Sequence, residues 1–305
     1  MINILISGAG GDVCDGVLKS LIISGKKFNI YIVGSFDNKL QLYFPFKILK
    51  SPKVAQKKKY LFFLKNTIAK YSIDIFIPCI DEEIDLISKY KKKLKCKVLV
   101  DNYNFVKNFN DKFLTYKFFL KNNIITPETR ICSEKNLSYF KFPFVIKKRN
   151  DSGSKNFKII NSRKDLTKIA IKEKDFIVQE YISGNDYTAG IYKVHKKIKI
   201  LLFERNLING RTQFAKKVLS DSMNKQIVDI FIKLNLNFCN MQFKFKNNQV
   251  SVYEINPRLS GTIGLQSNFF NFPYFFIKKN FPTKKIIKNN SKNISAIRVN
   301  DFLFI

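Results

Sequence analysis

Histidine and tryptophan are almost missing from this chain, which has one histidine and no tryptophan among 305 residues. A Ser–His or Cys–His nucleophile needs a histidine to take its proton, and the sole candidate, His195, lies in a lysine-rich segment, so this catalysis is disfavoured. Cysteine is sparse, and no two cysteines form a C-x-x-C pair: they are Cys14, Cys79, Cys96, Cys132 and Cys239. This spacing disfavours a zinc site or a disulfide framework and predicts free, buried thiols.

Long apolar runs are absent as well. The chain has no stretch of about 18 uncharged apolar residues, which a membrane-spanning helix would need. Its first residues do not form a signal peptide with an apolar core and a small-residue cleavage site. We therefore expect a cytoplasmic protein without a membrane partner.

Acidic residues are few, with 23 Asp and Glu against 55 Lys and Arg and a formal net charge of +32. Such an excess can indicate a polyanion partner. Here it is spread along the whole chain, is mostly lysine, and comes with much Asn, Ile and Phe, as an AT-rich coding sequence would impose. No recognised nucleic-acid module accompanies clusters such as residues 57–59 and 91–93, so we expect solvated helix faces and no specific nucleic-acid partner.

Apolar strands alternate with helical segments, which is typical of an α/β protein. Residues 1–8 predict a buried strand that runs into a glycine turn and then a helix. Gly8 and Gly10 match the first two glycines of a dinucleotide fingerprint, but Val13 occupies the third place. Asp37 lies beyond the distance expected for a ribose carboxylate, so a nicotinamide site is the minority interpretation of this turn.

Carboxylates gather after a later strand of the same region, predicted at residues 74–79. Asp81, Glu82 and Glu83 follow this strand and predict a helix start, where negative side chains favour the helix dipole. Simple helix-start residues and ligands are equally open interpretations of these three.

Most of the polar chemistry lies in residues 249–261, which begin as a probable strand. Side chains alternate faces along a strand, so Glu254, Asn256 and Arg258 begin on one side. Arg258 offers a forked cation suited to phosphate. A bare strand of this kind would usually be a solvated edge, and the preceding segment weakens that alternative.

Residues 238–245 predict the other arm of a hairpin that closes around residues 247–248. With a regular ladder and an odd-numbered loop, Gln242 falls directly opposite Glu254. Their oxygens, together with that of Asn256, suit Mg²⁺ or Mn²⁺ that keeps its waters and takes further ligands from phosphates.

These two arms resemble the metal-binding hairpin of the ATP-grasp superfamily, in particular its carbamoyl-phosphate-synthetase-like and amino-acid-ligase branches. The pattern N-x-Q followed by E-I-N-P-R-x-S-G is matched by Asn240, Gln242, Glu254, Asn256, Pro257, Arg258, Ser260 and Gly261. The resemblance implies an α/β fold in which a Rossmann-like domain, residues 1–101, precedes a two-subdomain ATP-grasp fold. Its subdomains would be residues 102–184 and residues 185–305, the latter with the metal hairpin.

Further segments resemble the family's nucleotide site in the same chain order. Lys112, at a helix start, and Lys147, at the end of a strand, match residues that contact ATP phosphates. A flap that closes over the triphosphate would be Ser152, Gly153 and Ser154, although such a turn is also common in solvated hairpins. The resemblance gives the adenine and ribose contacts to Glu180, Tyr181, Ile182 and Asp186.

The resemblance implies that ATP lies between the two ATP-grasp subdomains and phosphorylates a small-molecule carboxylate, and that an amine or ammonia attacks the resulting acylphosphate. Lys112, Lys147 and Arg258 would offset the triphosphate charge while Mg²⁺ bridges its oxygens. Arg205 and Arg211 flank a predicted turn and are candidates for gripping the acceptor carboxylate bidentately. Two surface arginines in a hairpin are an equally open interpretation.

Two other classes of function stay open. One is an NAD(P)-dependent oxidoreductase that uses the N-terminal glycine turn and has no need of Mg²⁺. The other is a non-catalytic nucleotide-binding or basic scaffold protein, which would bind ATP or polyanions without turnover. Homodimerisation is open in each case.

Overall fold

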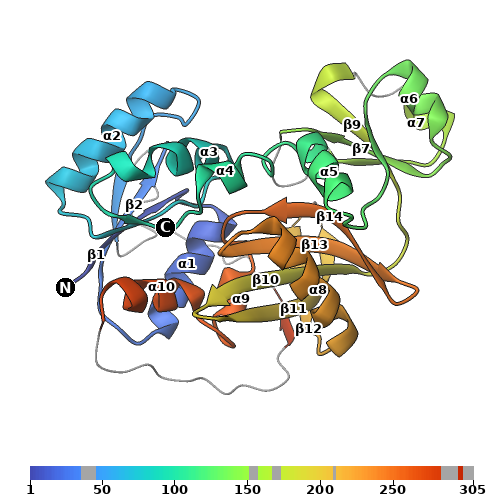
Figure 1. Ribbon diagram of the computed structural model, residues 1–305. Coiled ribbons are helices and arrows are strands. Elements are labelled where there is room, and N and C mark those ends of the chain that lie inside the picture. Colours follow the sequence, from blue (N-terminus) through green and yellow to red (C-terminus); the bar gives the residue numbers. More distant parts are fainter. Residues whose placement is uncertain (36–45, 151–156, 167–172, 209–210, 283–294, 298–305) are drawn as a thin grey trace.

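Three β-sheets organise the protein, with helices between and around them (Figure 1). The computed structural model describes residues 1–35, 46–150, 157–166, 173–208, 211–282 and 295–297. The predicted α/β class is confirmed. The sheets lie within residues 3–98, 129–180 and 186–297, while the domain boundaries at residues 101 and 184 stay predictions.

The amino-terminal sheet is parallel, with strand order β3-β2-β1-β4-β5. Its strands are β1 (Asn3–Ser7), β2 (Asn29–Gly34), β3 (Lys47–Lys50), β4 (Ile75–Ile77) and β5 (Lys97–Val98). Its helical segments are α1 (Asp12–Ile23), α2 (Lys57–Lys70), α3 (Asp81–Tyr90), η2 (Lys91–Lys93) and α4 (Tyr103–Val106). Buried apolar side chains along β1 fit a parallel strand that is covered on both faces.

The glycine turn that the sequence predicts after β1 is present and leads into a helix. Gly8 and Gly10 have φ angles of 77° and 74°, a left-handed conformation that glycine adopts without a Cβ clash. The turn leads directly into α1 and so fixes where that helix begins.

The second sheet is antiparallel, with strand order β6-β9-β7-β8. Its strands are β6 (Thr129–Ile131), β7 (Phe144–Lys148), β8 (Lys158–Ile160) and β9 (Phe176–Glu180). The helical segments of this region are α5 (Lys112–Lys121), α6 (Glu134–Tyr139), α7 (Arg163–Leu166) and η3 (Glu173–Asp175). Asp111 caps α5 by accepting hydrogen bonds from the backbone N–H groups of Phe113 and Leu114, so Lys112 is the first residue of the helix.

The third and largest sheet is also antiparallel, with strand order β14-β13-β10-β11-β12-β15. Its strands are β10 (Asp186–Val194), β11 (Lys197–Ile208), β12 (Arg211–Lys217), β13 (Phe238–Lys246), β14 (Gln249–Asn256) and β15 (Ser295–Ile297). The helices here are α8 (Asp221–Leu234), α9 (Ile263–Gln266) and α10 (Phe272–Asn280).

One face of the large sheet is apolar along its length. Its buried side chains include Tyr187, Ala189, Ile191, Leu202, Met241 and Phe243, and they form one cluster with Ile227 and Phe231 of α8 and Phe119 of α5. Burial of such residues removes apolar surface from water, which fixes these helices on the sheet.

The opposite face changes character along the strands. Towards α1 and α10 it is apolar, where Tyr192, Leu201, Phe203 and Phe238 join the same cluster as Val17 and Ile277. Towards the other end it carries Asp186 opposite Arg205, and Gln242 opposite Glu254. Helices α1 and α10 therefore cover one half of this face, and the other half is left for polar chemistry.

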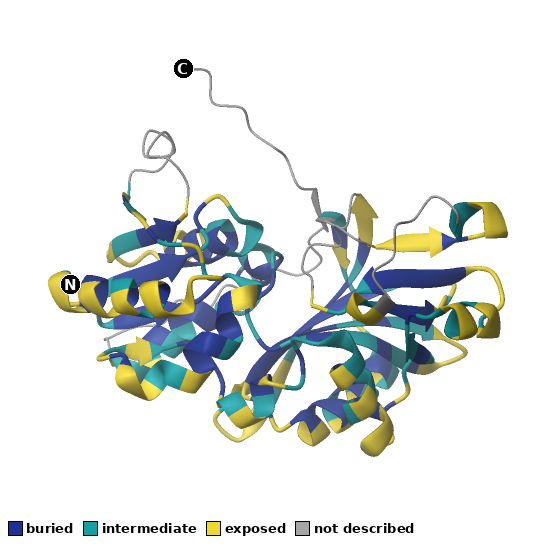
Figure 2. Cartoon of the chain, turned by 90° about the horizontal axis from the view of Figure 1, so that it is seen from above, coloured by how far each residue is buried: buried dark blue, intermediate teal, exposed yellow. Residues whose placement is uncertain are grey.

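Burial follows this arrangement, with dark strands inside each part and exposed residues on the outer helices (Figure 2). The cysteines are free, and all but Cys96 are buried, as predicted. Among helices in the described ranges, none has the length and apolar character needed to cross a membrane.

Candidate active site

A tight turn closes the hairpin of β13 and β14. Asn247 and Asn248 have φ angles of 50° and 58°, and Lys246 pairs with Gln249 across the turn. Two consecutive residues with positive φ are typical of a two-residue hairpin turn that favours asparagine. The predicted hairpin around these two asparagines is confirmed, but its loop has two residues rather than the expected odd number.

A bulge further along the hairpin restores the expected pairing. Phe243 pairs with Val252, but Gln242 pairs with Glu254, so Tyr253 is an extra residue on its strand. Without the bulge, the two-residue turn would place Gln242 opposite Tyr253. Glu254 would then point to the other face of the sheet, because a slip of one residue exchanges the faces of a strand. The predicted Gln242–Glu254 pair is therefore confirmed, although the ladder is irregular.

Asn256 extends the same polar row. It pairs with Asn240 across the hairpin, and its Nδ2 donates to Oε1 of Glu254 at 2.9 Å. This contact confirms that Asn256 and Glu254 lie on one face. No cluster of three or more His, Cys, Asp or Glu side chains suited to a metal occurs in the ranges that the structure describes. A metal here would rely on one carboxylate, amide oxygens and oxygens of a ligand.

Two lysines set the charge state of Glu254. Burial opposes its ionised form, but Lys112, Lys147, the hydrogen bond from Asn256 and Arg205 together hold the pKa of Glu254 below its ordinary value. Burial in turn lowers the pKa of Lys147 to about 8, with Glu254 acting in the opposite direction. The Lys147 side chain lies over Tyr253, with Nζ 5.5 Å from the ring centre. The site thus combines an ionised carboxylate with cations from α5 and β7.

A second polar cluster adjoins the first on the same sheet face. Nη2 of Arg205 donates to Oε1 of Gln242 at 2.7 Å and to the hydroxyl of Tyr253 at 2.9 Å. The Tyr253 hydroxyl donates to Oδ1 of Asp186 at 2.7 Å, and Nζ of Lys244 lies 3.0 Å from Oδ2 of Asp186. Arg205, predicted for the acceptor, and Asp186, predicted for the ribose, are therefore joined through Tyr253.

Tyr253 is a site residue that sequence reasoning missed, because its sequence marks it only as a strand former. The bulge turns it into the polar cluster, and a bulge has no reliable signal in a single sequence.

Arg258 ties the loop after β14 to the amino-terminal part. Its Nε donates to Oδ1 of Asp81, and its Nη2 donates to Oδ2 at 2.8 Å. A bidentate pair of this kind fixes the orientation of the guanidinium. In the structure Arg258 binds Asp81, and contact of Arg258 with phosphate stays a prediction.

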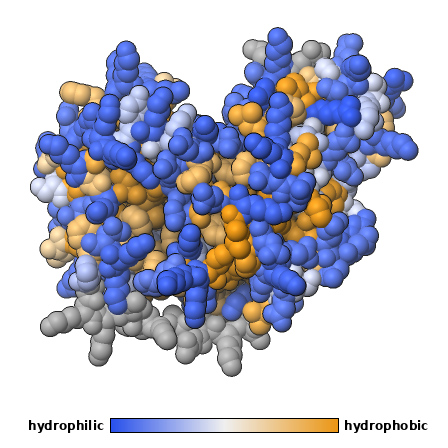
Figure 3. Space-filling model, viewed as in Figure 1, coloured by the Kyte–Doolittle hydropathy of each residue, from blue (hydrophilic) through white to orange (hydrophobic). Residues whose placement is uncertain are grey.

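A cavity of about 350 Å³ opens beside these groups. Its wall includes Asp81, Glu82 and Asp85 of α3, Lys112 of α5, and Tyr253, Glu254 and Asn256 of β14. In the space-filling view, the surface is indented between the amino-terminal part and the lobe of the four-stranded sheet at upper right (Figure 3). The cavity offers a small molecule room beside Glu254.

The predicted adenine segment follows β9. Glu180 and Tyr181 are exposed, and Ile182 is partly buried. Oε2 of Glu180 accepts from the backbone N–H of Glu128 at 3.3 Å. The predicted flap residues Ser152, Gly153 and Ser154, like the side chain of Arg211, lie outside the described residues.

Another buried carboxylate lies in the amino-terminal part. Glu83 accepts hydrogen bonds from the hydroxyls of Ser7 and Tyr60 and from the backbone N–H groups of Cys79 and Ile80. Burial raises the pKa of Glu83 to about 7, although these hydrogen bonds act against the rise. Glu83 thus closes the first turn of α3, in line with the helix start that the sequence predicts.

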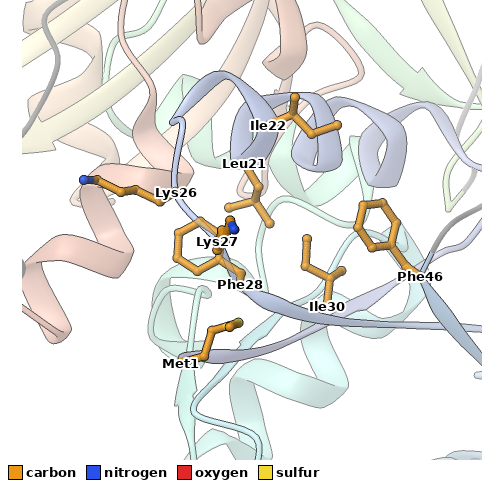
Figure 4. A pocket seen from close by; sticks show the side chains of 8 residues that line it. All are labelled: Met1, Leu21, Ile22, Lys26, Lys27, Phe28, Ile30 and Phe46. Atoms are coloured by element: carbon orange, nitrogen blue, oxygen red, sulfur yellow. The ribbon is translucent and has the colours of Figure 1, made fainter.

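A second hollow, of about 320 Å³, lies beside α1 and β2 (Figure 4). Its wall is apolar apart from two lysines and consists of Met1, Leu21, Ile22, Lys26, Lys27, Phe28, Ile30 and Phe46. It offers neither a carboxylate nor an amide side chain, so the hairpin cavity is the better candidate for catalysis.

The sequence model of a family described as ATP-grasp domain matches residues 109–262. The chain belongs to the ATP-grasp family. This match covers half of the 305 residues and takes in both antiparallel sheets as far as the loop after β14. The resemblance that the hairpin motif carries is therefore confirmed.

Curated relatives are ligases where their names state an activity. The chain is 29% identical over 169 residues to a D-alanine–D-alanine ligase of Petrotoga mobilis, covering 48% of this chain and 56% of that protein. It is 24% identical over 268 residues to a tyramine–L-glutamate ligase of Methanocaldococcus jannaschii, covering 83% and 77%. An uncharacterised Mycoplasma genitalium protein, MG011, is 33% identical over 108 residues, 33% of this chain and 37% of that protein. The chain thus spans little more than half of the first of these ligases and about a third of MG011.

Solved structures agree on the fold. An L-amino acid ligase from Bacillus licheniformis superposes with a TM-score of 0.72 at 13% identity, covering 94% of this chain and 75% of that one. A biotin carboxylase from Campylobacter jejuni gives 0.69 at 13% identity, covering 94% and 72%. A Rossmann-like part followed by an ATP-grasp fold is therefore the architecture of this chain. Neither the oxidoreductase nor the scaffold alternative gains support from these comparisons.

Proposed function

We propose that this protein is an ATP-dependent carboxylate–amine ligase. ATP would phosphorylate a small-molecule carboxylate, and an amine or ammonia would then displace phosphate from the acylphosphate. The observation that carries the proposal is Glu254, a carboxylate kept ionised among lysines beside a cavity in an ATP-grasp fold. Relatives named as D-alanine–D-alanine ligase and tyramine–L-glutamate ligase support the reaction class.

The donor set fits a magnesium–nucleotide complex. Mg²⁺ prefers hard oxygens, binds through one or two carboxylates and fills its remaining places with water and phosphate. Glu254 and Asn256 supply a carboxylate and an amide within hydrogen-bond reach of each other, and Gln242 stands opposite Glu254. When bound there, Mg²⁺ or Mn²⁺ would neutralise charge that develops on the transferred phosphoryl group.

Lysines on two elements would hold the triphosphate. Lys147 is buried, and a neighbouring phosphate would restore the charge that burial disfavours. Lys112 is the first residue of α5 and lines the cavity, so it would reach the same ligand from another side. Both lysines would stabilise negative charge in the transition state more than they activate any nucleophile.

The cavity beside Glu254 would take the acid and the amine. Arg258 borders this region and is oriented by Asp81, so it is our candidate for contact with the acylphosphate or the terminal phosphate. Arg211 keeps its predicted role toward the acceptor carboxylate.

The remaining nucleotide contacts are proposals of the same kind. Glu180 ends β9, Tyr181 and Ile182 follow it, and Asp186 begins β10, so they border both antiparallel sheets. The flap at residues 152–154 would close over the phosphates. A cytoplasmic location and the oligomeric state remain predictions.

Trapping with hydroxylamine tests the proposal directly. The wild-type protein is incubated with ATP, Mg²⁺, hydroxylamine and a panel of carboxylates, and both ADP and hydroxamate are measured. We expect one class of acid to stimulate ADP release and to give a hydroxamate, the trapped form of an acylphosphate. ATP binding with neither product across a broad panel would instead support a nucleotide-binding protein, and phosphate on an alcohol would indicate a kinase.

A further inference from the structure

Arg205 is a buried cation with unused hydrogen-bonding capacity. It lies on β11 directly opposite Asp186, and its exposed fraction is 8%. Its two side-chain hydrogen bonds to described residues leave from one nitrogen, Nη2, while its Nε is buried and has no hydrogen-bond partner in the part of the chain that the structure describes. A buried donor without a partner is costly, so this guanidinium is arranged for an acceptor that the protein itself does not supply.

The amide of Gln242 holds this guanidinium in place. Its Oε1, the atom that a metal ion would need, accepts from Nη2 of Arg205 at 2.7 Å. A divalent cation on the same oxygen would be repelled by the guanidinium, because both are positive and their separation would be short. Gln242 is therefore better suited to orient Arg205 than to bind the ion.

The surroundings of Arg205 indicate what the missing acceptor is. Its second partner, Tyr253, lies under the amine of Lys147 and donates to Asp186. Arg205 thus shares Tyr253 with the candidate phosphate lysine and the candidate ribose carboxylate, and it is not part of the wall of the acceptor cavity. A ligand that spans this gap carries a ribose at one end and phosphates at the other.

We propose that Arg205 binds a phosphate of the nucleotide, with Gln242 and Tyr253 as its positioning residues, and that Glu254 and Asn256 hold the divalent ion without Gln242. This inference rests on the proposed function, since it needs a nucleotide in the site. It changes the role that the sequence predicts for Arg205 from the acceptor carboxylate to the triphosphate. A guanidinium suits this task because it is permanently charged and matches phosphate geometry.

Two binding measurements separate the roles of these residues. The first is the affinity for the non-hydrolysable analogue AMP-PNP without divalent ions, by calorimetry in EDTA. The second is the affinity of the AMP-PNP complex for Mn²⁺, by electron paramagnetic resonance. The variants are Arg205→Met, Arg205→Lys, Gln242→Met and Glu254→Gln. Lys199→Met is the charge-matched control, because Lys199 is an exposed residue of the same strand.

We expect Arg205→Met to weaken AMP-PNP binding in EDTA by about ten- to a hundredfold, as for loss of a charged hydrogen bond. Arg205→Lys should lose less, and Lys199→Met should bind as the wild type does. Gln242→Met should weaken AMP-PNP binding but leave Mn²⁺ affinity unchanged, whereas Glu254→Gln should lose Mn²⁺ affinity.

Two results would overturn the inference. The first is an AMP-PNP affinity in Arg205→Met and Arg205→Lys that equals the affinity in Lys199→Met. The second is a loss of Mn²⁺ affinity in Gln242→Met as large as the loss in Glu254→Gln. Circular dichroism checks that each variant is folded, and Arg205→Lys keeps the test valid if Arg205→Met is not. A wild-type protein that binds no AMP-PNP would contradict the proposed function itself, which is a different outcome.

Discussion

Two glutamates of this chain, the buried Glu83 and the partly buried Glu254, lie in opposite electrostatic surroundings. Glu83 is enclosed by hydroxyls and backbone N–H groups, and burial raises its pKa to about 7. Glu254 is only partly buried and lines the cavity, and Lys112, Lys147 and the hydrogen bond from Asn256 together hold its pKa below the ordinary value. Burial alone therefore does not mark a functional carboxylate. The charge of the neighbours separates the residue that closes a helix turn from the one that faces a ligand.

Replacement of Glu254 should give the largest functional effect. Glu254→Gln keeps the shape of the side chain but removes the anion beside the two lysines, so turnover should fall on the order of 10²- to 10³-fold. AMP-PNP affinity in EDTA should fall little or rise, since a negative charge has been removed from the phosphate site. Acid-dependent ADP release and calorimetry measure the two quantities, and equal losses in both would contradict this role.

The pH dependence of stability should distinguish the two glutamates next. The pKa of Glu83 is raised from 4.5 to about 7, so the folded state holds its proton more tightly than the unfolded state does. The stability that it contributes is complete below pH 4.5 and is lost as the pH rises to 7, by about 3 kcal/mol. Glu254 has a lowered pKa, so its contribution to stability changes in the other direction: it is lost as the pH falls below the ordinary pKa of a glutamate.

Urea unfolding of the wild type and of Glu83→Gln between pH 4.5 and 7 measures this dependence. The free energy of unfolding of the wild type should fall relative to that of the variant as the pH rises. A constant difference would show that Glu83 does not titrate in this window.

A smaller effect is expected for Glu83→Gln at pH 4.5, where the contribution of Glu83 is complete. The amide retains one acceptor oxygen and turns its NH₂ group toward donors, so the free energy of unfolding should fall by about 2 kcal/mol. Glu82→Gln is the matched control on the same helix, because Glu82 is exposed, and its stability should change by less than about 0.5 kcal/mol. If turnover fell in Glu83→Gln as far as in Glu254→Gln, the contrast between the two glutamates would be lost.

The smallest effect concerns the partner of Glu254. Burial lowers the pKa of Lys147 to about 8, so Lys147 loses its positive charge above pH 8 in the free protein. A phosphate bound beside Lys147 would keep this side chain protonated. AMP-PNP affinity should therefore fall by up to about tenfold per pH unit above 8. The arginine of Lys147→Arg keeps its charge at all these pH values, so AMP-PNP affinity should depend less on pH in this variant. If calorimetry gave the same pH dependence for the variant and the wild type, Lys147 would not be the titrating group.

Local patterns carry the successful part of the sequence prediction. The hairpin around residues 247–248 and the pairing of Gln242 with Glu254 depend on segments that are close in sequence. The pairing was nevertheless expected for an incorrect reason, because the shorter loop and the bulge at Tyr253 compensate for each other. A bulge is set by packing across the sheet, and a single sequence does not record it.

Contacts between distant segments are the part that sequence could not give. Arg258 binds Asp81, 177 residues away, and Arg205 binds Gln242 on another strand. Burial raises the pKa of Glu83, and the hydroxyls of Ser7 and Tyr60, which come from β1 and α2, oppose that rise. Periodicity places each of these residues on its own element, but only the assembled fold determines which charges meet.

A titration of both carboxyl groups tests the contrast most directly. Carbon-13 NMR of glutamate side chains follows the two groups from pH 3 to 9, with Glu83→Gln and Glu254→Gln identifying the signals. We expect Glu83 to titrate near pH 7 and Glu254 to stay ionised to below pH 4.5. If both groups titrated together near 4.5, or if Glu254 took up its proton first as the pH fell, Glu254 would not be the ionised centre of the site.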